Sequence, residues 1–293
     1  MRSTPPNKKM TNQLEKEIVS LYLDGLSAAS ILKTINVDFK TTKTIYDILK
    51  KHEVIARDRK TAQDPGLRHD YFKSIDTPEQ AYLLGLMISD GWVVNPQRDS
   101  SGNIIRSAQI AFSLTESDLE TVEWVKDQWN TSNKISTIIK PPSTFPNGKT
   151  YSSQPATRVV VTSQIMFQDL NALGVDDRKS YVSLLPIIEL DLYSHLLRGI
   201  IDGDGTIGLY KYGNKKVPII KFLGSQCLMG QISWFLTHHV GLGYVKPSGK
   251  EKQSLSSITY SKINEVKKLY EYLYNNDCKS LKRKKIYLED YFS

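Results

Sequence analysis

The sequence predicts an α+β protein built from two similar halves that follow a small all-α domain. One observation is a short apolar motif ending in Asp-Gly, which occurs at residues 83–91 and again at 197–205. A second is that both motifs open the same predicted order of elements: helix, two strands, helix, two strands, helix. A third is a basic N-terminal stretch with helical periodicity. The predicted organisation is a helical domain at 1–60, a polar linker at 61–77, a first half at 78–185, a connector at 186–193 and a second half at 194–293.

The N-terminal domain is predicted to contain three short helices. Leu14 and Ile18 have helical spacing, Ser27 is suited to capping a second helix, and a third helix begins near Thr41. With 12 Lys/Arg against 7 Asp/Glu, residues 1–60 carry a net charge of +5. This arrangement resembles a helix-turn-helix unit, whose last helix enters the major groove of DNA. An alternative is a helical bundle with a solvated basic face. The candidate DNA contacts are Lys40, Thr42, Lys43 and Tyr46.

The strands of the two halves are predicted from alternation and turn residues. In the second half they are 206–212, 217–223, 243–248 and 254–260, with a helix at 226–240 between the two pairs. In the first half the strands at 92–95 and 104–114 flank a hairpin tip, and a Pro-rich loop occupies 141–150.

Small residues repeat every four positions in both motif helices. Residues four apart lie on one face of a helix, and small side chains there let two helix backbones approach closely. The two motif helices are therefore predicted to pack on each other and to bring Asp90 and Asp204 together at their ends. The predicted interface residues are Gly85, Ser89, Gly199 and Gly203.

The two aspartates point to a divalent metal site. Each carboxylate would lie at the negative end of a helix dipole, which is unfavourable by about 0.3–1 kcal/mol, and the two would repel each other. Mg²⁺ would offset both penalties, because it binds through one or two carboxylates together with waters and phosphate. It can also activate water and stabilise a leaving oxygen. The alternative is that Asp-Gly merely ends each helix, with Gly91 and Gly205 as C-cap residues.

The two motifs resemble those of the LAGLIDADG homing endonucleases in their monomeric, two-motif form, over about residues 78–290. The resemblance implies two αββαββα halves related by a pseudo-dyad, whose sheets form a saddle over double-stranded DNA. It implies metal-bound aspartates beside the scissile phosphates and a double-strand break with short 3′ overhangs at a long asymmetric target. The first motif departs from the family at Ile88, where an acidic residue is common and usually structural.

The resemblance also suggests further site residues. Gln226 and Glu116 match positions that place solvent in the active site. Lys179 and Lys284 match basic residues that face the cleaved backbone, with Arg178 and Arg283 as alternatives in register. The strand residues expected to contact bases are Arg98, Arg106, Gln109, Tyr210, Tyr212, Lys221 and Lys246. A slip of one residue in register would reverse these strand assignments.

Composition limits the remaining possibilities. The net charge of +8 and a pI near 9.2 favour a polyanionic partner. Two cysteines and no long apolar run indicate a reducing, intracellular location with no membrane segment. The function expected is a Mg²⁺-dependent DNA endonuclease of a mobile intron or phage genome. Two alternatives remain open, an RNA-binding maturase that helps an intron to splice and a catalytically inactive DNA-binding regulator.

Overall fold

The fold is that of a computed structural model. The predicted site residues Lys40 and Lys179, and the alternative Arg178, lie outside the described residues, and so does the side chain of Tyr212. The structure divides into two compact units, one centred on the N-terminal helices and one containing both predicted halves. The described residues are 11–23, 26–35, 37, 41–54, 64–102, 104–139, 141–144, 148, 150–152, 154–176, 184–213, 215–249, 255–274 and 279–292.

The N-terminal unit contains the three predicted helices, α1 (Asn12–Leu23), α2 (Ala28–Thr34) and α3 (Thr42–Lys51). The Oγ of Ser27 accepts a hydrogen bond from the backbone N–H of Ser30 at 3.0 Å, so Ser27 caps α2 as its sequence position predicts. The helices enclose a small apolar core made by one face of each helix: Leu14, Ile18, Tyr22, Ala28, Ile31, Ile35, Ile45, Ile48 and Leu49.

The larger unit begins before the first motif helix, inside the segment predicted to be a linker. Tyr71, Phe72 and Ile75 are buried, and the hydroxyl of Tyr71 donates to Gln128 Oε1 at 2.9 Å. Residues 71–77 are therefore part of the folded unit. The flanking polar residues, such as Asp70, make the average composition of this segment polar, which is why the sequence predicts a linker there.

The first half folds as predicted, with two short hairpins added at its loops. Its elements are α4 (Pro78–Ser89), β1 (Gly91–Val94), β2 (Gln97–Arg98), β3 (Ile104–Arg106), β4 (Gln109–Thr115), α5 (Leu119–Trp129), β5 (Ser136–Ile138), β6 (Ser143–Thr144), β7 (Thr150–Tyr151), β8 (Ala156–Thr162) and α6 (Gln164–Ala172). The main sheet is antiparallel in the order β1-β4-β8-β5. Along β4 the side chains of Ile110, Phe112 and Leu114 face the core, as strict alternation requires.

The second half repeats this layout with one strand fewer among the described residues. Its elements are α8 (Tyr193–Gly203), β9 (Thr206–Tyr212), β10 (Lys215–Gly224), α9 (Gln226–Phe235), β11 (Ser256–Tyr260), α10 (Ile263–Tyr274) and α11 (Lys282–Phe292). The sheet order is β11-β10-β9. The strand predicted at 243–248 is wrong, because only Ser248 pairs, with Ser257. Gly243 and Pro247 explain this, since glycine weakens a strand and proline cannot donate to a ladder.

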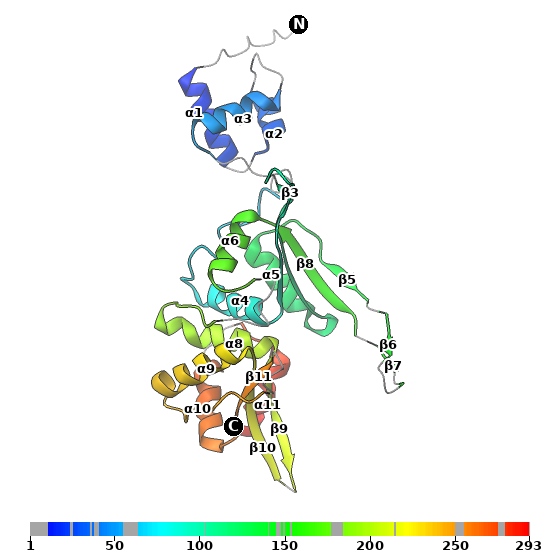
Figure 1. Ribbon diagram of the computed structural model, residues 1–293, viewed down its shortest axis with the longest axis vertical. Coiled ribbons are helices and arrows are strands. Elements are labelled where there is room, and N and C mark those ends of the chain that lie inside the picture. Colours follow the sequence, from blue (N-terminus) through cyan, green and yellow to red (C-terminus); the bar gives the residue numbers. More distant parts are fainter. Residues whose placement is uncertain are drawn as a thin grey trace. The chain divides into compact units, whose positions relative to one another are not determined.

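Helices α4 and α8 lie side by side at the centre of this unit (Figure 1). A Cβ added at Gly85 would overlap the carbonyl oxygen of Leu196 and lie 2.9 Å from the Cα of Gly199. A Cβ added at Gly199 would overlap the carbonyl oxygen of Tyr82 and lie 2.9 Å from the Cα of Gly85. Each pair of partners is 114 residues apart (199 − 85 and 196 − 82), so the two contacts are equivalent. The halves are thus related by a pseudo-two-fold axis through this crossing, and the chain has the predicted α+β fold.

No helix among the described residues is both long and apolar enough to cross a membrane.

Candidate active site

Asp90 and Asp204 end the two central helices in the same conformation. Their φ/ψ angles are −94°/−9° and −86°/−10°, and each residue is the C-cap of its helix. Gly91 and Gly205 follow them without the left-handed φ of a glycine C-cap. They are glycines because of close approach, since a Cβ would lie 2.5 Å from the carbonyl oxygen of Met87 or 2.6 Å from that of Ile201.

The carboxylate of Asp90 faces the end of the other central helix. Its Oδ2 lies 2.7 Å from the point where a Cβ on Gly203 would stand, and the side chain of Ser89 occupies the same space. Gly203 immediately precedes Asp204, so the two predicted metal ligands and the four predicted interface residues meet at one crossing.

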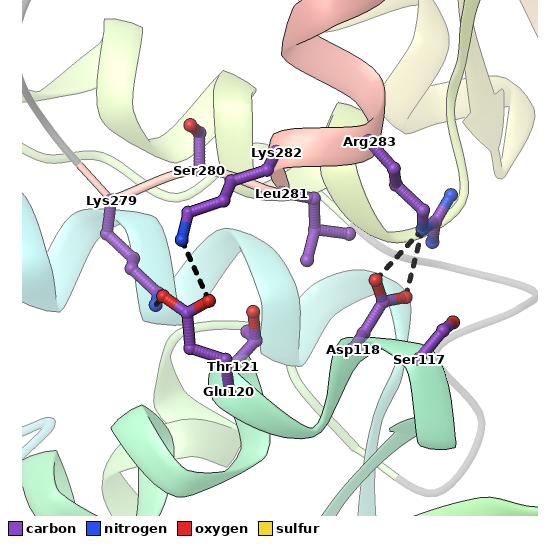
Figure 2. Close-up of a pocket in the computed structure, with 9 residues that line it drawn as sticks. All are labelled: Ser117, Asp118, Glu120, Thr121, Lys279, Ser280, Leu281, Lys282 and Arg283. Atoms are coloured by element: carbon purple, nitrogen blue, oxygen red, sulfur yellow. Dashed lines mark hydrogen bonds and ion pairs between the residues drawn. The ribbon is translucent and has the colours of Figure 1, made fainter.

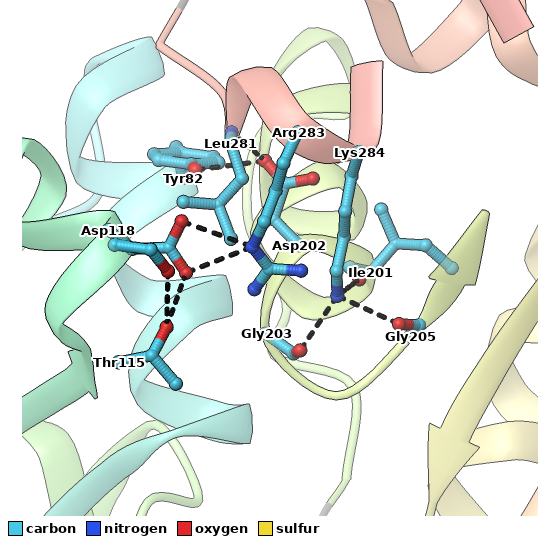
Figure 3. A network of polar contacts seen from close by, with 11 residues as sticks. Tyr82, Thr115, Asp118, Ile201, Asp202, Gly203, Gly205, Leu281, Arg283 and Lys284 are labelled. Carbon is cyan, nitrogen blue, oxygen red and sulfur yellow. Dashed lines mark hydrogen bonds and ion pairs between the residues drawn. The ribbon is translucent and has the colours of Figure 1, made fainter. Parts of the chain in front are cut away.

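Lys284 is the cation at this crossing (Figure 3). It is 6% exposed, and its Nζ donates to the carbonyl oxygens of Ile201, Gly203 and Gly205, each at 2.8 Å. Three carbonyls use all three donors of the ammonium group. The ammonium of Lys284 thus binds the C-terminal end of α8, and its contact with a cleaved backbone stays a prediction.

Both aspartates influence the protonation of Lys284. Burial, and secondarily the neighbouring Arg283, lowers the pKa of Lys284 to about 8. Asp202, Asp90 and Asp204 act in the opposite direction and favour the charged form. The ammonium also complements the negative end of the α8 dipole. The protein itself thus offsets part of the charge penalty for which the sequence analysis invokes a metal ion.

Asp202 is a buried structural carboxylate, whose hydrogen-bond partners the sequence analysis did not identify. Its Oδ2 accepts from the hydroxyl of Tyr82 at 2.9 Å and from the backbone N–H of Leu281 at 2.8 Å, and its Oδ1 accepts from the hydroxyl of Tyr274 at 2.6 Å. Burial raises the pKa of Asp202, and these hydrogen bonds oppose the shift. The matching position in the first motif is Ile88, which is buried. The structural role that the resemblance gives to this position agrees with these contacts.

The donor set fits a hard divalent cation. Mg²⁺ takes oxygen ligands and completes its shell with waters and substrate phosphate, so two carboxylates from two helix ends suffice. Among the described residues there is no group of three or more His, Cys, Asp or Glu that could hold a metal ion. Any metal here would therefore take its charged ligands from Asp90 and Asp204 and fill the rest of its shell with uncharged oxygens.

Glu116 and Gln226, the other described residues of the predicted catalytic set, both lie at the junction between a strand and the helix that follows it. Glu116 follows the last residue of β4, and Gln226 begins α9 after the capping residue Ser225. Both side chains are exposed.

The predicted base-contacting residues of the strands lie on the surface. Gln109 and Lys221 point to the sheet faces opposite the core, because their neighbours Ile110 and Ile220 are buried. Tyr210 lies on the same face as Lys221, because Lys221 pairs with Thr206, four residues before Tyr210. Arg106 donates to Gln109 Oε1 at 3.2 Å, whereas Arg98 donates to the carbonyl oxygen of Gly102 within its hairpin. Of the other predicted DNA contacts that the structure describes, Lys43, Tyr46 and Lys246 are exposed and Thr42 is half-buried. The backbone of Tyr212 pairs with that of Lys215.

Sequence reasoning missed three side chains on the outer face of the first sheet. They are Trp92, Ser113 and Arg158. Trp92 pairs with Ala111 and Ser113 pairs with Arg158, so all three lie on the same face as Gln109. Trp92 is 50% exposed. The alternating pattern of residues 156–162 predicts a strand. Pairing that strand with β4 would have placed Arg158 on this face.

Alkaline pH is expected to destabilise the protein through the Asp202 cluster. Burial, followed by the charge of Asp202, raises the pKa of Tyr82 and of Tyr274 well above 10.0. The folded protein keeps these protons after the unfolded chain has lost them, so the free energy of unfolding falls as pH rises above 10. The slope is about 1.4 kcal/mol per pH unit for each such tyrosine.

Urea unfolding between pH 9 and 11.5 measures this slope. Tyr274→Phe should reduce it by the contribution of one proton, whereas Tyr210→Phe, at a surface position, should leave it unchanged. Equal slopes for the wild type and Tyr274→Phe would contradict the assignment.

Comparison with known proteins gives matches among solved structures only. No protein-family model and no curated protein matches the chain. The meganuclease I-SmaMI bound to uncleavable DNA is similar to it with a TM-score of 0.47 and 11% identity, over 70% of this chain and 86% of that one. The LAGLIDADG meganuclease I-AabMI bound to uncleaved DNA has a TM-score of 0.47 and 14% identity, over 74% of this chain and 89% of that one. I-SmaMI is described as a LAGLIDADG homing endonuclease and I-AabMI as a LAGLIDADG meganuclease.

Proposed function

We propose that this protein is a metal-dependent, site-specific DNA endonuclease that acts as a monomer and cuts both strands of a long asymmetric target. The observation that carries the proposal is the pair of equivalent helix ends, each terminating in an aspartate, at a pseudo-two-fold crossing of α4 and α8. A duplicated carboxylate on an approximate dyad matches a substrate with two antiparallel strands, each of which needs one hydrolytic step.

The proposed chemistry divides between the crossing and the sheets. Asp90 and Asp204 would hold the divalent metal, which supplies an activated water and stabilises the leaving oxygen of the phosphodiester. Lys284 keeps the turn around Asp204 in place, and Glu116 and Gln226 would orient solvent near the scissile phosphates. The outer sheet faces, with Gln109, Lys221 and Arg158, would contact the duplex, and the net charge of +8 favours that contact.

The defining experiment is cleavage of a randomised duplex library by the full chain with Mg²⁺ and, separately, with EDTA. Metal-dependent cutting at one long motif, with 3′ overhangs at the sequenced ends, is the expected result. Selective binding without cutting would instead indicate the inactive regulator. Preference for structured intron RNA over duplex DNA would indicate the maturase.

The N-terminal helices are proposed to add affinity on flanking DNA. Deleting residues 1–60 should weaken binding and flatten its salt dependence, because the segment carries a net charge of +5 and releases counterions on binding. Tethering adds this affinity by raising effective concentration, so the cleavage rate at saturating protein should not change.

A point variant localises the effect within the domain. Lys43→Gln on α3 should lower the salt slope by about 1, whereas Lys33→Gln, at an exposed position of α2, should not. Unchanged affinity and salt slope in the deletion variant would refute a role of this domain in DNA binding.

A further inference from the structure

The first turn of α11 is held by carboxylates from both halves of the larger unit. On the side of the second half, Asp202 accepts the backbone N–H of Leu281. From the first half, Asp118, just before α5, accepts from the Nε of Arg283 at 3.1 Å to Oδ1 and 3.0 Å to Oδ2 (Figure 3). Lys284 is the next residue, so its position follows from how this turn is held.

Asp118 is built for this contact. It is 8% exposed, and the hydroxyl of Thr115 donates to its Oδ2 at 3.2 Å, which fixes the direction of the carboxylate. Arg283 is 49% exposed at its side chain, so its guanidinium reaches from the surface of α11 back to the first half. A half-exposed ion pair contributes little to the free energy of folding. The role of this ion pair is therefore to fix the position of the Arg283 side chain.

We propose that Asp118 is a positioning residue for the second active-site carboxylate: it orients Arg283, which places Lys284, which holds the turn carrying Asp204. This inference rests on the proposed nuclease function. It means that the first half sets the geometry of the carboxylate contributed by the second half, so neither half is an independent catalytic unit.

The neighbouring polar cavity supports this reading over a ligand site. It has a volume of about 230 Å³ and lies beside the same turn (Figure 2). Its cations are already matched with acids of the first half: Lys279 and Lys282 with Glu120 at 3.5 and 3.0 Å, and Arg283 with Asp118. The cavity is thus the solvent side of a cross-half set of ion pairs, in which each of the three cations already has a carboxylate partner.

The matched comparison is Asp118→Asn against Glu120→Gln. Both remove one carboxylate from the same cross-half set of ion pairs, but Glu120 is 63% exposed and pairs with Lys279 and Lys282. The first readout is acylation of Lys284 by acetic anhydride, measured by mass spectrometry against Lys262, whose side chain is 80% exposed. We expect protection of Lys284 in the wild type and in Glu120→Gln, and loss of protection in Asp118→Asn.

The second readout is cleavage kinetics on the target found with the wild type. Asp118→Asn should lower kcat by about 10- to 100-fold through misplacement of the carboxylate, with KM nearly unchanged. Glu120→Gln should cut at the wild-type rate, and Asp118→Glu should recover most of the loss. If Asp118→Asn does not fold, Arg283→Gln tests the same link from its exposed side.

Two results would overturn the proposal: unchanged protection of Lys284 in Asp118→Asn, or equal effects of Asp118→Asn and Glu120→Gln. If the wild type cuts no DNA with any divalent metal, the proposed function fails. The acylation comparison still decides in that case whether Asp118 holds Lys284.

Discussion

Asp90→Asn and Asp204→Asn, made separately, are each expected to lower the rate of DNA cleavage by at least about 100-fold. Each substitution removes one of the two carboxylates that end α4 and α8, and so one of the two charged oxygen donors available for a divalent cation. Shape is preserved, because asparagine is isosteric with aspartate. Single-turnover cleavage of the target at saturating protein measures the chemical step, free of effects on DNA affinity.

The control for these variants is Asp127→Asn, which changes an exposed aspartate on α5 and should leave cleavage unchanged. Binding of Mn²⁺, followed by electron paramagnetic resonance, gives a readout independent of cutting and should weaken in both active-site variants. Wild-type cleavage in either variant would remove that aspartate from the mechanism.

Gly85→Ala is expected to lower the free energy of unfolding by at least about 3 kcal/mol, the upper end of the usual cost of overpacking. The added methyl group would meet the Leu196 carbonyl oxygen and the Cα and N of residues 199 and 200. These are backbone atoms of a neighbouring helix and cannot turn aside as a side chain would, so α4 and α8 must separate. Because the contacts are equivalent, Gly199→Ala should cost the same within error.

Gly208→Ala in β9 is the matched control, since no atom lies within 4 Å of the added Cβ and its φ is not positive. We expect a change in stability of less than about 1 kcal/mol there. Urea titrations of the three variants decide the matter. A Gly85→Ala protein as stable as Gly208→Ala would show that the two helices do not pack in backbone contact.

Local patterns were sufficient to predict the central crossing and most elements. The small-residue repeat around Gly85 and Gly199 depends only on helical periodicity, and the hairpin of β9 and β10 on alternation and a turn. The environment of Lys284 was not predictable in this way. It depends on the meeting of α11 with the end of α8, about 80 positions earlier in the chain.

Other features escaped prediction for similar reasons. Asp202 accepts hydrogen bonds from Tyr82 and Tyr274, which belong to two other helices. The sequence around each tyrosine does not indicate this partner. The expected strand at 243–248 shows the converse failure, in which alternation is present but Pro247 removes a needed donor. Roles that depend on long-range contacts are thus the ones that a single sequence conceals.

The pairing of Ser89 with Gly203 has a consequence for how such a molecule can be assembled. These positions are equivalent under the pseudo-two-fold operation (203 − 89 = 114), yet one carries a side chain that fills the space left by the other. A homodimer of first halves would set serine against serine and force the helices apart, and a homodimer of second halves would leave a void. The contact at this crossing is therefore sterically matched between unlike halves. We expect isolated halves mixed in solution to pair with each other rather than with themselves.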